Sequence, residues 1–231
     1  MAKHGKKYRT AAQKVDPDKK YELKEAIGLA KDSNSEKFDE SLDVAVRLSL
    51  DPRKADQNIR GSVVLPKGTG KKFRVLVFAK GDKETEAKAA GAVEVGGDDL
   101  VAKVQGGWME FDRVVATPDM MGQVGKLGKI FGPRGLMPNP KTGTVTDDTA
   151  SAVNAVKAGR IDFKLDRNGG VAAPIGKVSF SADQLADNGN AVMNAIRQVR
   201  PASTKGIYIC GATLSATVSP GIPIETDVFE K

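Results

Sequence analysis

The sequence predicts an α/β protein of two domains, with the second domain inserted into the first. Towards both chain ends, the predicted strands alternate apolar and polar residues, which is typical of an antiparallel sheet with one covered face. In the middle, short apolar strands alternate with helical segments, which is typical of a small parallel sheet. The antiparallel sheet is therefore expected to combine strands from both ends of the chain in an outer α+β domain.

The N-terminal segment is basic and precedes a predicted helix. Residues 1–15 carry five lysines and arginines and no acidic residue. This composition favours either a basic arm that becomes ordered on RNA or a solvated, disordered terminus. Asp16-Pro17-Asp18 places acidic residues where a helix begins, and apolar residues from Leu23 to Ala30 follow at helical spacing.

The first strands come next. Residues 42–50 alternate apolar and polar positions, which predicts a half-buried strand. A loop at 51–60 leads to a short strand at 62–65, which Pro66 ends.

The middle of the chain changes to the pattern of a parallel sheet. Residues 73–79 are almost continuously apolar, as expected for a strand covered on both faces. Further strands are predicted at 92–95 and 114–117. Helices are predicted at 84–90, 98–105, 120–131 and 147–158, the last with Thr146 as its N-cap.

The alternating pattern returns after Gly159. Residues 161–165 predict a strand, and Asn168-Gly169 in the turn after it is a strong hairpin signal, with the partner strand around 177–180. A helix at 182–199 ends before Pro201, and a last strand covers 206–218.

Neither end of the chain has enough helices and strands to bury its own apolar face. We therefore expect residues 1–67 and 160–231 to form one discontinuous domain, with residues 68–159 inserted. Both crossings contain glycine, so either relative motion or a rigid interface is compatible with the sequence. The inserted segment has 13 basic and 11 acidic residues and the outer segments 23 and 18, which favours the outer domain for RNA binding.

The whole chain is moderately basic, with a net charge of +7 and a pI near 9.4. This favours a polyanionic partner, with an inert basic surface as the alternative. Cys210 is the one cysteine, so no intrachain disulfide forms, and we expect a small buried hydrophobe in a reducing cytoplasm. No apolar segment follows the N-terminus as in a signal peptide, and none is long enough to span a bilayer.

Motifs for catalysis are weak. Residues 67–72 hint at a phosphate loop, but Leu65 stands where glycine is needed and Lys72 where serine or threonine is needed. The one histidine is His4, which leaves little histidine-dependent catalysis or metal binding. Paired carboxylates such as Asp98-Asp99 suit helix starts. We expect no enzyme, no cofactor and no metal, with a nucleotide- or phosphate-ester-binding enzyme as the alternative.

Three features are candidates for RNA contact. Segment 125–140 combines glycines and prolines with basic residues, and either touches phosphates or caps the α/β sheet. Phe38 either stacks on a base or belongs to the core. The last strand presents a row of hydroxyls that suits RNA sugars and phosphates but also an ordinary solvated face, with Leu214, Ala216 and Val218 opposite. The row consists of Thr213, Ser215, Thr217 and Ser219.

Together these residues resemble the family of large ribosomal subunit protein L-one, along essentially the whole chain. Segment 125–140 is the most specific match, and the length and basic N-terminus are similar to bacterial members. Further similar blocks are Asp51-Pro52-Arg53, Asp56-Gln57-Asn58-Ile59-Arg60-Gly61, Val115-Ala116-Thr117-Pro118-Asp119 and Lys157-Ala158-Gly159-Arg160-Ile161.

The resemblance implies a ribosome-associated, cytoplasmic protein whose inserted domain is Rossmann-like. It implies binding to the rRNA of the mobile stalk and help in releasing deacylated tRNA from the exit site. It also implies translational repression of its own operon through binding to the mRNA.

The resemblance places the rRNA contacts on the outer domain. They fall on Lys37, Phe38, Ser41, Asp166, Arg167, Asn168, Gly169, Thr217, Val218 and Ser219. At the last three positions the family usually has Thr-Met-Gly. Val218 keeps an apolar contact with shorter reach, and Ser219 in place of glycine restricts close approach of the backbone.

Overall fold

The computed structural model describes residues 5–34, 37–204 and 206–226, so Lys3 and His4 lie outside the described residues. The chain divides into two compact units. The outer unit combines the described residues up to Gly70 with those from Ile161 onward, and the inner unit is Lys71–Arg160.

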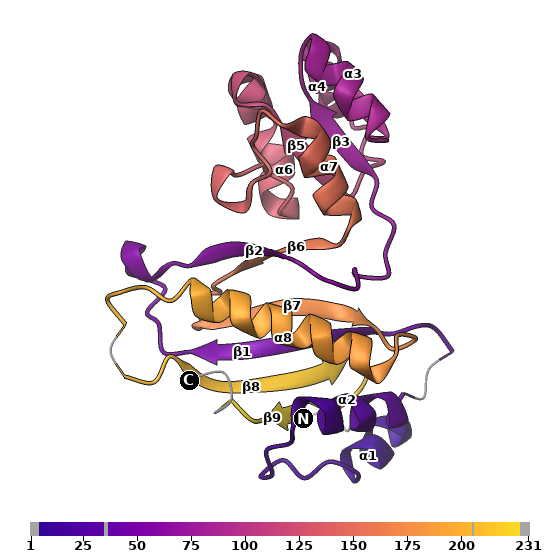
Figure 1. Cartoon of the computed structure of the whole chain (residues 1–231), viewed down its shortest axis with the longest axis vertical. Coiled ribbons are helices and arrows are strands. Elements are labelled where there is room, and N and C mark those ends of the chain that lie inside the picture. Colours follow the sequence, from indigo (N-terminus) through magenta and orange to yellow (C-terminus); the bar gives the residue numbers. More distant parts are fainter. Residues whose placement is uncertain (1–4, 35–36, 205, 227–231) are drawn as a thin grey trace. The chain divides into compact units, whose positions relative to one another are not determined.

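The outer unit is built around a four-stranded antiparallel sheet with the order β7-β1-β8-β9, and a second pair, β2 and β6, lies in the same unit (Figure 1). Its elements are α1 (Lys6–Ala12), α2 (Leu23–Asp32), β1 (Ser41–Leu48), the 3₁₀ turn η1 (Ala55–Gln57), β2 (Arg60–Val64), β6 (Arg160–Lys164), β7 (Gly170–Lys177), α8 (Ala182–Gln198), β8 (Ile209–Ala216) and β9 (Ile222–Ile224). The predicted antiparallel sheet from both chain ends is confirmed.

One face of this sheet is covered and the other is open. Leu42, Val44 and Val46 of β1 are buried, whereas Ala45 and Arg47 between and after them are exposed, as the alternation predicted. The buried side chains share one core with apolar residues of α2 and α8, and α8 lies across β7 and β1 (Figure 1). Each fully buried aliphatic side chain contributes about 1.5–3 kcal/mol to this packing.

The N-terminal segment differs from its prediction. Residues 6–12 form α1, and Ala11 and Val15 are buried, so the disordered alternative is wrong for the described part of this segment. Helix α2 begins at Leu23 rather than near Asp16. The Asp16 carboxylate accepts a hydrogen bond from the Asp18 backbone N–H (3.0 Å), so these acids close a turn instead of starting a helix.

The turn after β6 is present, but the predicted hairpin is wrong. Strand β6 pairs with β2 and β7 pairs with β1, so the turn joins two different sheets. Strand β7 begins at Gly170, not near residue 177. The sequence did not predict this start, because small residues and Pro174 give the segment no clear alternation of apolar and polar positions. Pro174 is tolerated because β7 is an edge strand.

The last predicted strand is shorter than expected and is followed by an unpredicted one. Strand β8 ends at Ala216, and β9 pairs with it through Ile222–Ile224.

The prediction that Cys210 is buried is wrong, since its side chain is exposed. Arg47 pairs with Gly211 and Leu48 with Ile209, so Cys210 is the extra residue of a bulge that turns it outward.

The inner unit is a parallel sheet with the order β4-β3-β5, flanked by helices. Its strands and α-helices are β3 (Val75–Phe78), α3 (Asp82–Ala89), β4 (Glu94–Gly96), α4 (Asp98–Gln105), β5 (Arg113–Ala116), α5 (Met121–Val124), α6 (Gly128–Arg134) and α7 (Thr149–Lys157). Short 3₁₀ turns lie at η2 (Pro118–Met120), η3 (Gly125–Leu127) and η4 (Pro140–Thr142).

Both faces of the inner sheet are buried. Leu76 and Phe78 belong to one apolar core, whereas Val75 and Val77 belong to another on the opposite face. The continuous apolar run around β3 therefore reflects burial on both sides, as predicted. The small parallel sheet is confirmed.

Two predictions for the inner unit, a continuous helix at 120–131 and the N-cap Thr146, are corrected by the structure. The helix predicted at 120–131 is broken into short α and 3₁₀ turns, because closely spaced glycines weaken a continuous helix. Helix α7 is capped by Asp148 rather than Thr146, since the Asp148 carboxylate accepts from the Ser151 backbone N–H (2.9 Å).

Candidate nucleic-acid interface

The first candidate cluster lies where β1 begins, and we call it the β1-start cluster: Lys37, Phe38, Ser41, Thr217, Val218 and Ser219. The antiparallel register places Leu42 opposite Ala216, so the beginning of β1 lies beside the end of β8. The Thr217 hydroxyl accepts from the Ser41 backbone N–H (3.2 Å) and donates to the Ser41 carbonyl (3.4 Å). Residues 176 positions apart in sequence are thus joined directly.

A buried carboxylate fixes the backbone of this cluster. Glu40 is 1% exposed, and its Oε2 accepts a hydrogen bond from the Val218 backbone N–H (3.0 Å). The Glu40 carbonyl accepts from the Val178 N–H (3.0 Å), which ties it to β7 as well. In the sequence, Asp39-Glu40 is only a pair of adjacent carboxylates, which does not indicate this role. Only the burial of Glu40 reveals it.

The cluster exposes apolar side chains to solvent. Phe38 is 51% exposed and Val218 is 42% exposed. The alternative that Phe38 belongs to the core is therefore wrong, and Val218 does not continue the buried face of β8, because the strand ends before it. Exposed apolar groups in a fixed turn suit stacking or packing against a partner.

The hydroxyl row predicted along the last strand is only partly present. Thr213 and Ser215 lie on the open face of β8, and Thr217 is exposed just beyond it. Ser219 turns back, since its Oγ accepts from the Ala216 N–H (2.8 Å) and donates to the Pro220 carbonyl (3.2 Å). Its hydroxyl closes the turn in place of facing outward with the others.

The second candidate cluster is the turn Asp166, Arg167, Asn168 and Gly169, here the β6–β7 turn. One oxygen of Asp166 accepts from the backbone N–H groups of Asn168 and Gly170, both at 2.7 Å. Gly169 has a φ of +79°, and a Cβ there would lie 3.1 Å from the Leu50 carbonyl oxygen, so glycine is needed. The Gly169 carbonyl accepts from the Leu48 N–H (2.9 Å), which attaches the turn to the end of β1.

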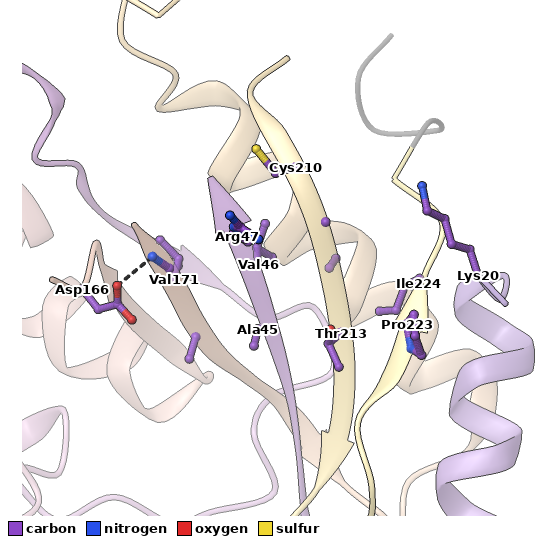
Figure 2. A pocket seen from close by; sticks show the side chains of 14 residues that line it. Lys20, Ala45, Val46, Arg47, Asp166, Val171, Cys210, Thr213, Pro223 and Ile224 are labelled. Carbon is purple, nitrogen blue, oxygen red and sulfur yellow. Dashed lines mark hydrogen bonds between the residues drawn. The ribbon is translucent and has the colours of Figure 1, made fainter. Parts of the chain in front are cut away.

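The two clusters lie at opposite ends of β1, about 23 Å apart at the usual rise of a strand. The open face of the sheet runs between them and holds a groove of about 410 Å³. Figure 2 shows Ala45 and Arg47 of β1 in this groove, with Asp166 on one side and Thr213 on the other. The structure therefore joins the sequence-predicted residues into two groups rather than one.

Residues 29–220 match the Ribosomal protein L1p/L10e family. The chain belongs to this family. As a member it is a ribosomal protein, a structural constituent of the ribosome that binds rRNA. None of the helices in the described ranges has both the length and the apolar character needed to cross a membrane.

The carboxyl edge of the inner sheet is where α/β enzymes bind phosphates, and here it is acidic. Helix α3 begins with Asp82, and α4 begins with Asp98 and Asp99. Lys80 forms an ion pair with Asp98 (3.2 Å), so this cation is already engaged. A phosphate at either helix start would meet carboxylates, which disfavours the enzyme alternative in this member of the ribosomal family.

Residues 125–140, which the sequence offered either as a phosphate contact or as a cap of the α/β sheet, form part of the inner core. Leu127 and Phe131 are fully buried, and Phe131 packs edge-on against Phe111 with ring centroids 5.8 Å apart. Gly135 ends α6 in the left-handed conformation (φ +67°), where an L side chain is disfavoured. Lys129 and Arg134 point their charges to solvent. The segment thus has a structural role, with its cations on the surface.

Proposed function

We propose that this ribosomal protein binds the rRNA of the mobile stalk of the large subunit through its outer unit. The contact residues are those of the β1-start cluster and the β6–β7 turn. The inner unit acts as an inserted, Rossmann-like domain, and the protein assists the release of deacylated tRNA from the exit site. In this proposal residues 1–67 and 160–231 form one domain, and residues 68–159 form a second domain inserted into it.

The β1-start cluster is the observation that carries the proposal. Phe38 and Val218 are both exposed, and the buried Glu40 accepts the Val218 backbone N–H and so fixes the chain next to Thr217. A surface that is rigid before binding loses little entropy when a partner docks. Aromatic and apolar groups beside a hydroxyl and Lys37 fit an unstacked base or ribose next to a phosphate.

The same surface also serves a second proposed RNA partner, the mRNA of the protein's own operon. Repression of translation follows when free protein exceeds the available rRNA. Support comes from the geometry: the groove on the open face of the outer sheet runs between the two clusters, and we expect both RNAs to use these contacts. They are then expected to exclude each other, and a ternary complex would contradict this part of the proposal.

A gel-shift competition tests the proposed function. Labelled stalk rRNA fragment is competed at fixed salt with unlabelled stalk, the operon mRNA leader and an unrelated RNA duplex. We expect the stalk and the leader to compete and the unrelated duplex to fail. Equal competition by the duplex identifies a non-specific basic binder and removes support for the two clusters.

The Thr217→Val variant tests the contact residues directly. Valine keeps the volume of threonine but loses the hydroxyl, and we expect rRNA affinity to fall by about 1–2 kcal/mol. Thr85→Val is the matched control, because Thr85 is an exposed threonine on α3 of the inner unit. Unchanged affinity in a folded Thr217→Val protein excludes this residue from the interface.

A further inference from the structure

A second groove of the outer unit lies between α1 and the end of α2, outside both clusters described above. We call it the α1–α2 groove, and its volume is about 300 Å³. Its lining includes Lys6, Lys7, Lys14, Asp32 and Ser33. Three lysines face one carboxylate, so the lining is net positive and suits an anion.

The lysines are placed by helical spacing. Lys6, Thr10 and Lys14 recur at every fourth position and share one side of α1 and its C-terminal extension. The Lys14 ammonium donates to the backbone carbonyl of Asp32 (3.3 Å), which directs it towards the end of α2. Within the described ranges, neither Lys6 nor Lys14 forms an ion pair. Their charges are therefore available to a ligand.

Ser33 supplies an independent indication of a ligand. The residue is 8% exposed and lines the groove, yet its Oγ has no hydrogen-bond partner in the described part of the chain. Leaving a buried hydroxyl without a hydrogen-bond partner destabilises a protein, so such groups are rare unless something binds them. A hydroxyl beside ammonium groups is a suitable donor to a phosphate oxygen.

The groove lies close to the β1-start cluster along the chain. Asn34 is separated from Lys37 by three peptide links, which span at most roughly 11 Å. A polyanion bound at Phe38 and Thr217 is therefore within reach of the groove. A free phosphate ion has no such reason to bind here, whereas a continuous RNA backbone does.

We propose that the α1–α2 groove binds backbone phosphates of the same RNA that occupies the β1-start cluster. The inference rests on the proposed function and adds a contact surface to it. Lys6 and Lys14 neutralise phosphate charge, and Ser33 donates a hydrogen bond to a phosphate oxygen. Because phosphates carry no sequence information, this groove adds affinity and salt dependence but no base specificity.

The test measures the affinity of the full-length protein for the stalk rRNA fragment across a salt series. Removing two phosphate contacts in K6Q/K14Q is expected to lower the log–log slope by about 1.4–1.8, at roughly 0.7–0.9 per contact. K72Q/K88Q is the matched control, since it removes the same charge from exposed positions of the inner unit. The control slope should equal that of the unmodified chain. Circular dichroism confirms that each variant is folded.

The outcomes separate this inference from the proposed function. One outcome is that the unmodified chain prefers the stalk rRNA and Thr217→Val lowers its affinity, but K6Q/K14Q keeps the full log–log salt slope. In that case the α1–α2 groove is not an RNA contact. If the unmodified chain shows no preference for the stalk, the proposed function itself fails. If K6Q/K14Q and K72Q/K88Q lose the same amount of salt slope, the loss is a bulk charge effect, and the assignment of the α1–α2 groove as an RNA contact is overturned.

Two further arms define the ligand. Ser33→Ala is expected to weaken stalk binding several-fold without changing the salt slope, because it removes a donor but no charge; unchanged affinity removes Ser33 from the site. Inorganic phosphate is titrated while the amide resonances of Lys6 and Ser33 are followed by NMR. Saturable shifts at millimolar phosphate together with an unchanged RNA slope in K6Q/K14Q identify a free-anion site and overturn the RNA assignment.

Discussion

The sheets of the two units differ in how many of their faces are buried. The inner sheet is covered on both faces, and β3 is buried at every position from Val75 to Phe78. The outer sheet is covered on one face by α2 and α8, and its other face presents Ala45 and Arg47 to solvent. A sheet with a free face can offer strand residues to RNA, whereas the inner unit can offer only helices and loops.

Several cations of the inner unit are engaged in ion pairs, whereas, in the described part of the chain, the cations beside the two candidate clusters are not. In the inner unit, Lys80 pairs with Asp98, Lys103 with Glu94, and Arg74 with Asp112. The guanidinium of Arg74 lowers the pKa of the Asp112 carboxyl through their hydrogen bond. Within the described ranges, Lys37 and Arg167 of the two clusters form no ion pair. Arg47, in the groove on the open face of the outer sheet, forms none either within those ranges. The net charges of the two segments favour the outer unit but do not show which individual cations are engaged.

The largest expected effect comes from breaking the inner unit. Phe78→Ala empties a fully buried position next to Phe131 (ring centroids 6.3 Å apart) and should cost about 3–5 kcal/mol of stability. Denaturant unfolding measures the loss. Stalk rRNA affinity, measured where the variant is still folded, should stay unchanged. A parallel loss of affinity would assign RNA binding to the inner unit and reverse the comparison.

Breaking the outer unit through one polar side chain should cost about 2–4 kcal/mol. The buried Asn188 amide accepts from the Lys67 N–H (3.0 Å) and donates to the carbonyls of Gly68 (3.0 Å) and Ile175 (2.7 Å). Asn188→Leu leaves all three groups unpaired, and thermal unfolding reports the loss. Asn190→Leu, exposed on the same helix, is the control and should change stability by less than about 0.5 kcal/mol.

A smaller and more specific effect is expected at Glu40. Glu40→Ala removes the acceptor of the Val218 N–H and should weaken stalk rRNA binding by about 1–2 kcal/mol. Glu40→Gln keeps an acceptor oxygen and should recover most of the affinity. Glu25→Ala on the exposed side of α2 serves as the control. If Gln and Ala variants bind equally weakly, the charge of Glu40 matters more than its hydrogen bond.

The smallest predicted effect is a pH dependence confined to the inner unit. Hydrogen bonds from Ser151 lower the pKa of the Asp148 carboxyl below its ordinary 3.8. A depressed pKa in the folded state stabilises the protein above that ordinary value, and the contribution is lost as pH falls through the folded pKa. In Asp148→Asn, acid unfolding below about pH 4 should be slightly shallower. An unchanged acid profile would show that this cap contributes no pH dependence.

Local patterns in the sequence predicted most elements, because alternation and helical spacing report burial directly. The strand at β1, helix α4 at 98–105 and helix α8 near 182–199 all followed from such patterns. The start of strand β7 was not predicted, because Pro174 and the small residues around it show no clear alternation of apolar and polar positions. The helix predicted at 120–131 was interrupted, since glycines within it weaken helical propensity.

The sequence by itself determined which faces are apolar, where the chain turns, and the family to which it is similar. Only the tertiary structure decided which distant residues meet. The register of β1 against β8 joins Ser41 to Thr217, and a bulge in that register exposes Cys210. The pairing of β6 with β2 rather than β7 carries the β6–β7 turn to the far end of β1. Strand pairing depends on contacts between residues far apart in sequence, which no local pattern encodes.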